Sequence, residues 1–462
     1  MTTRHLALTA LALIAACGDS APDATATIDA TATPDALADA TATADATATP
    51  DAIADTTAVD SADADTSDDR TIFPGLYRMD GLDPTLPDDD LAPLWDLVLD
   101  ADVVGLGESV HTSGGFYATK ERLVRDLVLG HGVRVLAMET PHTAATWLDR
   151  YLQEGPCDAD PVAVFGPPHY PIFGVFVDDH TAALFRWLCE WNAAHGDDRV
   201  RFFGFDAQQP SDDLDAFAAF LDAHAADRKE AAMASLAPCN SVYGEAYPAE
   251  DFAACNAAID ALEADLAASV EAQVPAHDWA ELAIDLRSFR SWQGQAFYDV
   301  IDVRRSWESR DVAMADIFEA RAALDFPGQR IALWAHNYHL AADHPHIAKT
   351  NFVANARTLG SELRLRRGRA YRPVAITAYH PGINWPGVST GDGSTEQGQG
   401  DGDIEQAFFD DTDADQLIYD PRSEWAPPEA EWFLSEEKMI MRDNFDAIVW
   451  LRASPPMHAV LW

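Results

Sequence analysis

Short apolar runs that alternate with helix-length segments between residues 102 and 453 constrain the fold more than any other feature of this sequence. Each run is too short for a typical helix and is rich in Val, Ile, Leu and Phe, as expected of a strand buried on both faces. The runs are DVVGLGES (102–109), VRVLAMET (133–140), RVRFFGFD (199–206), RIALWAHN (330–337), YRPVAITAY (371–379) and DAIVWLRA (446–453). Their order predicts an α/β fold with a largely parallel sheet flanked by helices.

The segments between these runs have the apolar spacing of amphipathic helices. Residues 116–130 and 180–196 both end in Gly, a residue that commonly terminates a helix. A long Ala-rich stretch, about residues 211–324, separates the third and fourth predicted strands. We expect it to form a helical bundle inserted into the same domain, which would cover residues 71–462.

The first 16 residues have the form of a signal peptide. Arg4 precedes an apolar run that is too short to span a bilayer. The run ends in Ile-Ala-Ala-Cys at residues 14–17, which resembles the bacterial lipoprotein box, where the peptide is cut before the Cys and the thiol is lipidated. An exported lipoprotein of the bacterial envelope, on the outer membrane or the cell surface, is therefore predicted. An ordinary secretory signal with an incidental Cys17 is the alternative.

The segment that follows Cys17 is predicted to be a tether. Residues 18–70 contain no aromatic residue and consist largely of Asp, Ala and Thr. Such a composition cannot bury enough apolar surface to offset the entropy of ordering the chain. We therefore expect residues 17–70 to be a disordered link between the lipidated Cys and the folded domain.

The charge balance excludes some partners. The 77 acidic residues exceed the 31 basic residues, so the formal net charge is −46. Nucleic acid and anionic lipid both bind clustered Lys and Arg, so neither is an expected partner of this acidic surface. The chain would reach a membrane only through its lipid anchor.

Four cysteines follow Cys17, and an even number in an exported chain favours disulfides. Three connectivities are possible. Cys239 and Cys255 flank a short segment between two predicted helices, so their pairing is the simplest choice. No pair has C-x-x-C spacing, which argues against a zinc ribbon.

Ionisable side chains follow four of the predicted strands. In an open α/β sheet the carboxyl ends of parallel strands form the edge where ligands bind. A single His or Glu at a strand end is equally compatible with a structural role, but the coincidence at several strands favours a hydrolytic site in which a carboxylate orients a neutral His base. The residues are Glu108, His111, Glu139, Asp206, His336 and His339.

Several blocks resemble the erythromycin esterase family in their order along the chain. They include GLGESVHTSGGFYATKERLVRDLVLGHGVRVLAMET, RWLCEWNA, SRDVAMADIF and LWAHNYHLA, and the resemblance runs from about residue 91 to residue 453. It implies an esterase that needs no cofactor. It places four residues in the family's active-site cluster and four more near the substrate: Glu108, His111, Glu139 and His336 in the first group, and Lys120, His339, Asp206 and Arg310 in the second.

Two positions depart from the family pattern. Lys120 stands where the macrolide-inactivating members have Arg, and Lys holds a carboxylate only as a point charge. Gly115 stands where the family motif has Glu, which predicts a wider pocket that does not bind macrolides productively.

The predicted function is hydrolysis of a small-molecule carboxylic ester or lactone. His111 would accept a proton from the attacking water, and Glu108 or Glu139 would orient the imidazole. His336, with Lys120 or Arg310, would stabilise the oxyanion.

Three other readings stay open. Glu108, His111, His336 and His339 could bind a catalytic metal, although Glu-x-x-His and His-x-x-His are weak spacings alone. A serine esterase would use Ser109, but the second Gly of the Gly-x-Ser-x-Gly motif is missing. A surface binding protein that lost activity is the third reading, and the missing motif Glu is its best support.

Overall fold

The structure is a computed structural model that describes residues 70–460, with gaps at 344–355, 385–403, 426–430 and 435–436. The predicted signal peptide, Cys17 and all of the predicted tether except its last residue lie outside this part of the chain. None of the described helices is both long enough and apolar enough to cross a membrane.

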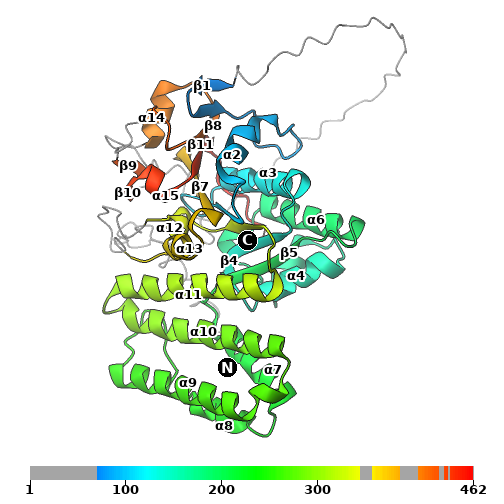
Figure 1. The fold of residues 1–462 in the computed structure, drawn as a ribbon, viewed down its shortest axis with the longest axis vertical. Helices are drawn as coiled ribbons and strands as arrows, with labels where there is room; N and C mark the ends of the chain where they lie inside the picture. The colour runs from blue at the N-terminus through cyan, green and yellow to red at the C-terminus, as the bar shows by residue number, and fades with distance from the viewer. Residues whose placement is uncertain (1–69, 344–355, 385–403, 426–430, 435–436, 461–462) are drawn as a thin grey trace, which may run out of the picture. The chain divides into compact units, whose positions relative to one another are not determined.

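Nine strands form one sheet in the order β1-β2-β8-β11-β7-β3-β6-β4-β5 (Figure 1). Its parallel strands are β3 (Val103–Leu106), β4 (Val135–Pro141), β5 (Arg201–Asp206), β6 (Ile331–Trp334), β7 (Tyr371–Pro381) and β11 (Ala447–Ser454). These are the six strands that the apolar runs predict, so the largely parallel α/β sheet is confirmed.

Shorter antiparallel strands complete one side of the sheet and were not predicted. They are β1 (Thr71–Phe73), β2 (Leu76–Arg78) and β8 (Gln416–Tyr419). Only three or four residues long, they lack the sustained apolar pattern from which a buried strand can be recognised. A separate two-stranded sheet pairs β9 (Glu431–Leu434) with β10 (Glu437–Ile440).

Helices cover both faces of the sheet. Side chains alternate between the two faces along each strand, so each strand contributes to two separate hydrophobic cores. Val104 and Leu106 of β3 join one core, which packs against α2 (Ala92–Val98), α3 (Gly114–Gly130), α4 (Ala145–Glu154) and α6 (Asp179–Ala194). Val103 joins the opposite core, which packs against α11 (Val303–Asp325), α13 (Leu359–Arg367) and α14 (Ile404–Asp411). Short helices α5 (Pro161–Phe165), α12 (Asn337–Leu340) and α15 (Met441–Asn444) lie in the connections.

The Ala-rich stretch forms the predicted helical insertion between β5 and β6. Its helices before α11 are α7 (Pro210–His224), α8 (Lys229–Ser235), α9 (Ala249–Ser269) and α10 (Ala276–Asp299). Figure 1 shows α11, α10 and α9 stacked in that order away from the sheet, and α7 to α10 share a core of their own.

Two disulfides are present. Cys239 and Cys255 are joined with 4.8 Å between their Cα atoms, which is the local pairing that the sequence favours. Cys157 and Cys189 are joined with 5.4 Å between their Cα atoms, so the segment after α4 is tied to α6.

Candidate active site

The strand register brings the predicted residues to one edge of the sheet. Trp334 of β6 pairs with Leu106 of β3 on one side and with Met138 of β4 on the other, and Met138 pairs with Gly204 of β5. Residues that follow this row therefore leave the sheet at its carboxyl edge, where two buried clusters of charged groups form.

Glu108 and His111 are the centre of the first cluster. Glu108 Oε1 accepts a hydrogen bond from His111 Nδ1 over 2.6 Å, and Oε2 accepts one from Lys120 Nζ over 2.6 Å. All three side chains are buried, with at most 2% of any of them exposed. Because a carboxylate only accepts, Nδ1 of His111 carries a proton and proton uptake takes place at Nε2.

Lys120 reaches Glu108 from α3. Its Nζ lies 4.5 Å from the centre of the Trp334 ring. Burial lowers the pKa of Lys120 to about 8, although the negative charge of Glu108 opposes this shift. Lys120 is therefore a buried counter-ion of Glu108.

Glu139 and Arg310 are the centre of the second cluster. Arg310 Nη2 donates to Glu139 Oε1 over 2.8 Å and to Asp206 Oδ2 over 2.6 Å, while its Nε donates to Asp206 Oδ1 over 3.2 Å. Burial raises the pKa of Glu139, but the charge and hydrogen bond of His339 and the charge of Arg310 outweigh burial and hold the pKa well below its usual value. Glu139 is thus an anion fixed by cations, which suits an anchoring role better than that of a base.

His339 links this cluster to a residue that the sequence argument missed. Its Nδ1 lies 2.8 Å from Asp311 Oδ1, and its Nε2 lies 3.3 Å from Glu139 Oε1. Burial lowers the pKa of His339, but Asp311 and Glu139 together raise it to about 10, so the ring is a cation. Asp311 directly follows Arg310 in the SRDVAMADIF block, and its place one residue after a predicted site residue was the available signal.

His336 lies between the two clusters and is the one half-buried residue among the predicted catalytic group. Its main-chain N–H donates to Glu139 Oε2 over 2.9 Å. Its Nδ1 accepts from the N–H of Tyr338 over 3.1 Å, and its Nε2 lies 3.0 Å from the carbonyl oxygen of Ser109, to which it donates. Burial is the main cause that holds the pKa of His336 well below its usual value, so the ring is neutral.

Aromatic rings surround His111. The ring centre of His111 lies 5.0 Å from that of His336 and 5.1 Å from that of Phe176. Phe176 itself is fully buried. The imidazole of His111 is therefore held between a second imidazole and an apolar ring.

The four predicted substrate-binding residues are all buried in ion pairs. Lys120, His339, Asp206 and Arg310 are each at most 4% exposed, and all four are held in the internal ion pairs just described. Each of them neutralises a buried partner, which would be left unpaired if the residue moved to a substrate. These ion pairs give the four residues a supporting place in the site, and their contact with substrate stays a prediction.

The expectation of a wider pocket at Gly115 is also wrong. Gly115 is buried, and its N–H donates to Ser454 Oγ over 3.0 Å. A Cβ atom at this position would lie 2.5 Å from Ser454 Oγ and 3.1 Å from Ser454 Cα. The Gly permits a close approach of α3 to the end of β11, and Ser454 fills the space that a larger side chain would take.

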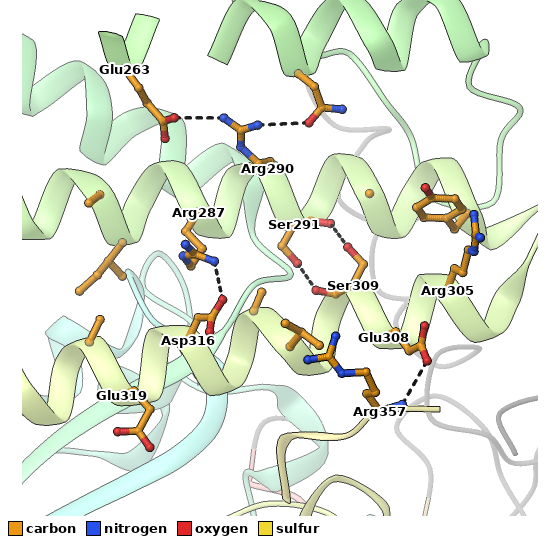
Figure 2. Close-up of a pocket in the computed structure, with 18 of the residues that line it drawn as sticks. Glu263, Arg287, Arg290, Ser291, Arg305, Glu308, Ser309, Asp316, Glu319 and Arg357 are labelled. Carbon is orange, nitrogen blue, oxygen red and sulfur yellow. Dashed lines mark hydrogen bonds and ion pairs between the residues drawn. The ribbon is translucent and has the colours of Figure 1, made fainter. Parts of the chain in front are cut away.

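A cavity of about 1120 Å³ lies along α9, α10 and α11 (Figure 2), and no residue of the two charged clusters lines it. Figure 2 shows that several of its charged side chains pair with each other, including Arg287 with Asp316 and Arg290 with Glu263. Because these charges are already matched and no cluster residue lines the cavity, we place the chemistry at the sheet edge.

The metal-site reading receives no geometric support at the cluster. In the described part of the chain, three ligand atoms come within 4.8 Å of one another only at His277, Glu281 and Asp325, on the surface of the insertion. The predicted ligand set of Glu108, His111, His336 and His339 does not meet this spacing.

A parallel sheet covered on both faces, with a His–carboxylate pair at the carboxyl edge of its strands, is an arrangement typical of hydrolytic enzymes. The family model of erythromycin esterase matches residues 128–454. The chain therefore belongs to the erythromycin esterase family, a family of esterase-like hydrolases. The matched range includes Glu139, Arg310 and His336 but begins after Glu108 and His111.

Solved structures share the fold. A Bacillus cereus protein aligns with a TM-score of 0.66 at 18% identity, over 83% of this chain and 96% of its own. A succinoglycan biosynthesis protein aligns with a TM-score of 0.65 at 17% identity, over 83% and 96% of the two chains. A mutant of the erythromycin esterase EreC in its open conformation aligns with a TM-score of 0.65 at 20% identity, over 82% and 97%. No significant match was found among curated proteins.

Proposed function

We propose that the protein hydrolyses a carboxylic ester or lactone by general base catalysis at His111. The observation that carries the proposal is the 2.6 Å hydrogen bond between His111 Nδ1 and Glu108 Oε1 in a buried setting. A carboxylate that holds one ring nitrogen fixes the tautomer, so that the other nitrogen can accept a proton, and stabilises the imidazolium that forms.

In this mechanism a water molecule donates a proton to His111 Nε2 as its oxygen attacks the acyl carbon. The protonated ring then donates that proton to the leaving alkoxide, so the base is restored without a covalent intermediate. Lys120 limits the negative charge of Glu108, and the packing of the Phe176 ring keeps the imidazole in place.

The oxyanion donor is His336 in this proposal. Its Nε2–H donates to the carbonyl oxygen of Ser109 in the resting site and would exchange that acceptor for the oxyanion. The neutral state of the ring favours this role, since Nδ1 is occupied by the N–H of Tyr338 and the proton stays on Nε2. Arg310 and Lys120, which the sequence offered as further donors, are held by carboxylates.

A substrate panel tests the proposal. Aryl esters, alkyl lactones and erythromycin would be offered to the wild-type protein and to His111→Ala, and acid release would be followed by titration at constant pH. We expect the wild type to hydrolyse at least one class and His111→Ala to lose that activity while keeping its thermal melting temperature. Equal turnover by both proteins would remove His111 as the base.

The same panel separates the other functional readings. A metal hydrolase would lose activity on treatment with a chelator and recover it when a divalent metal is added. A binding protein would bind a compound of the panel without acid release. A serine enzyme would be labelled at Ser109 by an aryl phosphonate, whereas the structure has His336 bound to the main-chain carbonyl of Ser109.

We also propose that Cys17 anchors the chain to a bacterial membrane. The Ile-Ala-Ala-Cys sequence and the aromatic-free stretch after it support this proposal. Expression with Cys17→Ser should move the protein from the membrane fraction to the soluble fraction. Retention of the variant in the membrane fraction would contradict lipidation at Cys17.

A further inference from the structure

The end of β11 and the segment that follows it cross the loop that carries the catalytic histidine. Ser454 is the last residue of β11 and is 3% exposed. Its Oγ lies 2.6 Å from Ser113 Oγ and accepts a hydrogen bond from the N–H of Gly115 over 3.0 Å. One side chain therefore holds both the residue before α3 and its first turn, two to four residues after His111.

Main-chain hydrogen bonds continue this contact. The N–H of Met457 donates to the carbonyl oxygen of Thr112 over 2.9 Å, and the N–H of Gly114 donates to the carbonyl oxygen of Pro455 over 2.7 Å. Ser113 and Pro456 form an antiparallel bridge. The loop after His111 is thus paired residue by residue with the segment 454–457, which lies more than 300 positions later in the sequence.

The backbone of Thr112 is strained and needs fixed surroundings, which the segment 454–457 helps to provide. Its φ of +67° is in the left-handed region, which is costly for a β-branched residue. Such a conformation persists only where the surroundings fix it. Here the N–H of Thr112 donates to Tyr117 Oη over 2.8 Å, and its carbonyl oxygen accepts from Met457. The strained residue directly follows His111, so the contacts that fix Thr112 also restrain the backbone that carries the imidazole.

The same segment also contacts the residues that follow Phe176, the aromatic residue beside His111. The N–H of Val460 donates to the carbonyl oxygen of Val177 over 3.2 Å, and Ala459 forms a bridge with Asp178. These residues directly follow Phe176, whose ring lies against His111. One continuous stretch of chain therefore contacts both the loop that carries the base and the loop that covers it.

We propose that Ser454 is a positioning residue for His111, and that the segment 454–460, here called the C-terminal strap, fixes the catalytic loop in its active geometry. The effect on the reaction rests on the proposed role of His111 as base. The effect on geometry does not, because it concerns the orientation of a side chain that can be observed without substrate.

Ser454→Ala is the test variant, since it removes the two hydroxyl contacts and leaves the strap in place. Ser306→Ala is the matched control, because Ser306 is also buried and donates through Oγ to a main-chain carbonyl, that of Gln295, over 2.9 Å. Two readouts are compared: kcat and KM on the best ester of the panel, and the downfield NMR resonance of the His111 Nδ1 proton, assigned by its loss in His111→Ala.

We expect Ser454→Ala to lower kcat by roughly tenfold with KM changed less than twofold, because small displacements of a catalytic group cost rate more than binding. The Nδ1 resonance should broaden or shift in Ser454→Ala and stay unchanged in Ser306→Ala. An unchanged resonance together with unchanged kcat in Ser454→Ala would overturn the proposal. Equal loss of kcat in both variants would also overturn it, since general destabilisation would then explain the effect.

The two proposals fail in different ways. If His111→Ala keeps full activity, the proposed function fails, while a resonance that moves only in Ser454→Ala still supports the strap. If His111→Ala is inactive and Ser454→Ala matches the wild type in both readouts, the strap fails and the proposed function stands.

Discussion

Lys120 and Glu108 form an ion pair in which neither side chain is exposed, with Nζ 2.6 Å from Oε2. A charge buried away from water is stabilised by its oppositely charged partner, so loss of one partner leaves the other charge uncompensated. The second oxygen of the same carboxylate holds His111. The protonation of Lys120 therefore bears directly on the base.

Lys120 should give the pH–rate profile an inflection. Its pKa is about 8, so above that pH it loses its charge and Glu108 acts on His111 without a counter-ion. We expect kcat to rise through this range, because an uncompensated carboxylate better stabilises the imidazolium. Lys120→Arg stays charged at every accessible pH and should lack the inflection. A wild-type inflection that persists in Lys120→Arg would show that another group titrates there.

Glu108→Gln should abolish most of the activity. The amide keeps the size of the side chain but removes the charge that orients His111, and kcat should fall by about 10²–10⁴-fold with little change in KM. Glu121→Gln is the control, because Glu121 is also buried, at 3% exposed, but lies on α3 and pairs with Arg125 and His180. Steady-state kinetics of the two variants make the comparison, and similar losses in both would argue against a specific role for Glu108.

His339 should make the folded state less stable as pH rises. Its pKa of about 10 in the folded state exceeds the usual 6.5, so the folded state binds more protons than the unfolded state between these values. Its contribution is complete below pH 6.5 and declines above it. Lys120 has its pKa lowered to about 8, so between that pH and its usual 10.5 it has the opposite effect.

The range between pH 6.5 and 8 therefore isolates His339 from Lys120. Urea unfolding of the wild type should lose roughly 1–2 kcal/mol across this range through His339. His339→Gln should show a shallower decline, although it is less stable throughout because Asp311 and Glu139 lose a cationic partner. Parallel curves for the two proteins would mean that His339 is not the titrating group.

Gly115→Ala should destabilise the fold. Its Cβ would lie 2.5 Å from Ser454 Oγ, and overpacking of this kind typically costs about 1–3 kcal/mol. Gly130→Ala is the control in the same helix, since its Cβ would meet only Asp126 Oδ1 at 3.4 Å. Calorimetry should show a lower melting temperature for the first variant alone. If both variants melt like the wild type, α3 and β11 are less closely packed than described.

The parallel strands could be predicted from the sequence because strands buried on both faces appear as continuous apolar runs. The same reasoning found the carboxyl edge, since residues such as Glu108 and Glu139 come directly after those runs. This reasoning could not predict which side chain each carboxylate binds. Nothing in the sequence distinguishes Glu108, which holds His111, from Glu139, which binds Arg310, because that choice depends on the order of strands in space.

Contacts between residues that are far apart in the sequence could not be predicted. Gly115 was expected to widen a pocket. The sequence alone does not show whether the space beside a Gly is empty or is filled by another residue. Ser454 lies more than 300 residues away and supplies that neighbour. The burial of Asp206 and Arg310 in one bidentate pair was missed for the same reason.

Hydrolysis by His111→Ala decides whether this histidine is the catalytic base. After removal of metal by a chelator, the wild type and the variant would be compared on the best ester or lactone of the panel, with melting temperatures recorded for both. We expect the chelator to leave wild-type turnover unchanged and His111→Ala to lose at least about 10²-fold in kcat at the same melting temperature. Turnover by His111→Ala at the wild-type rate would rule out His111 as the general base.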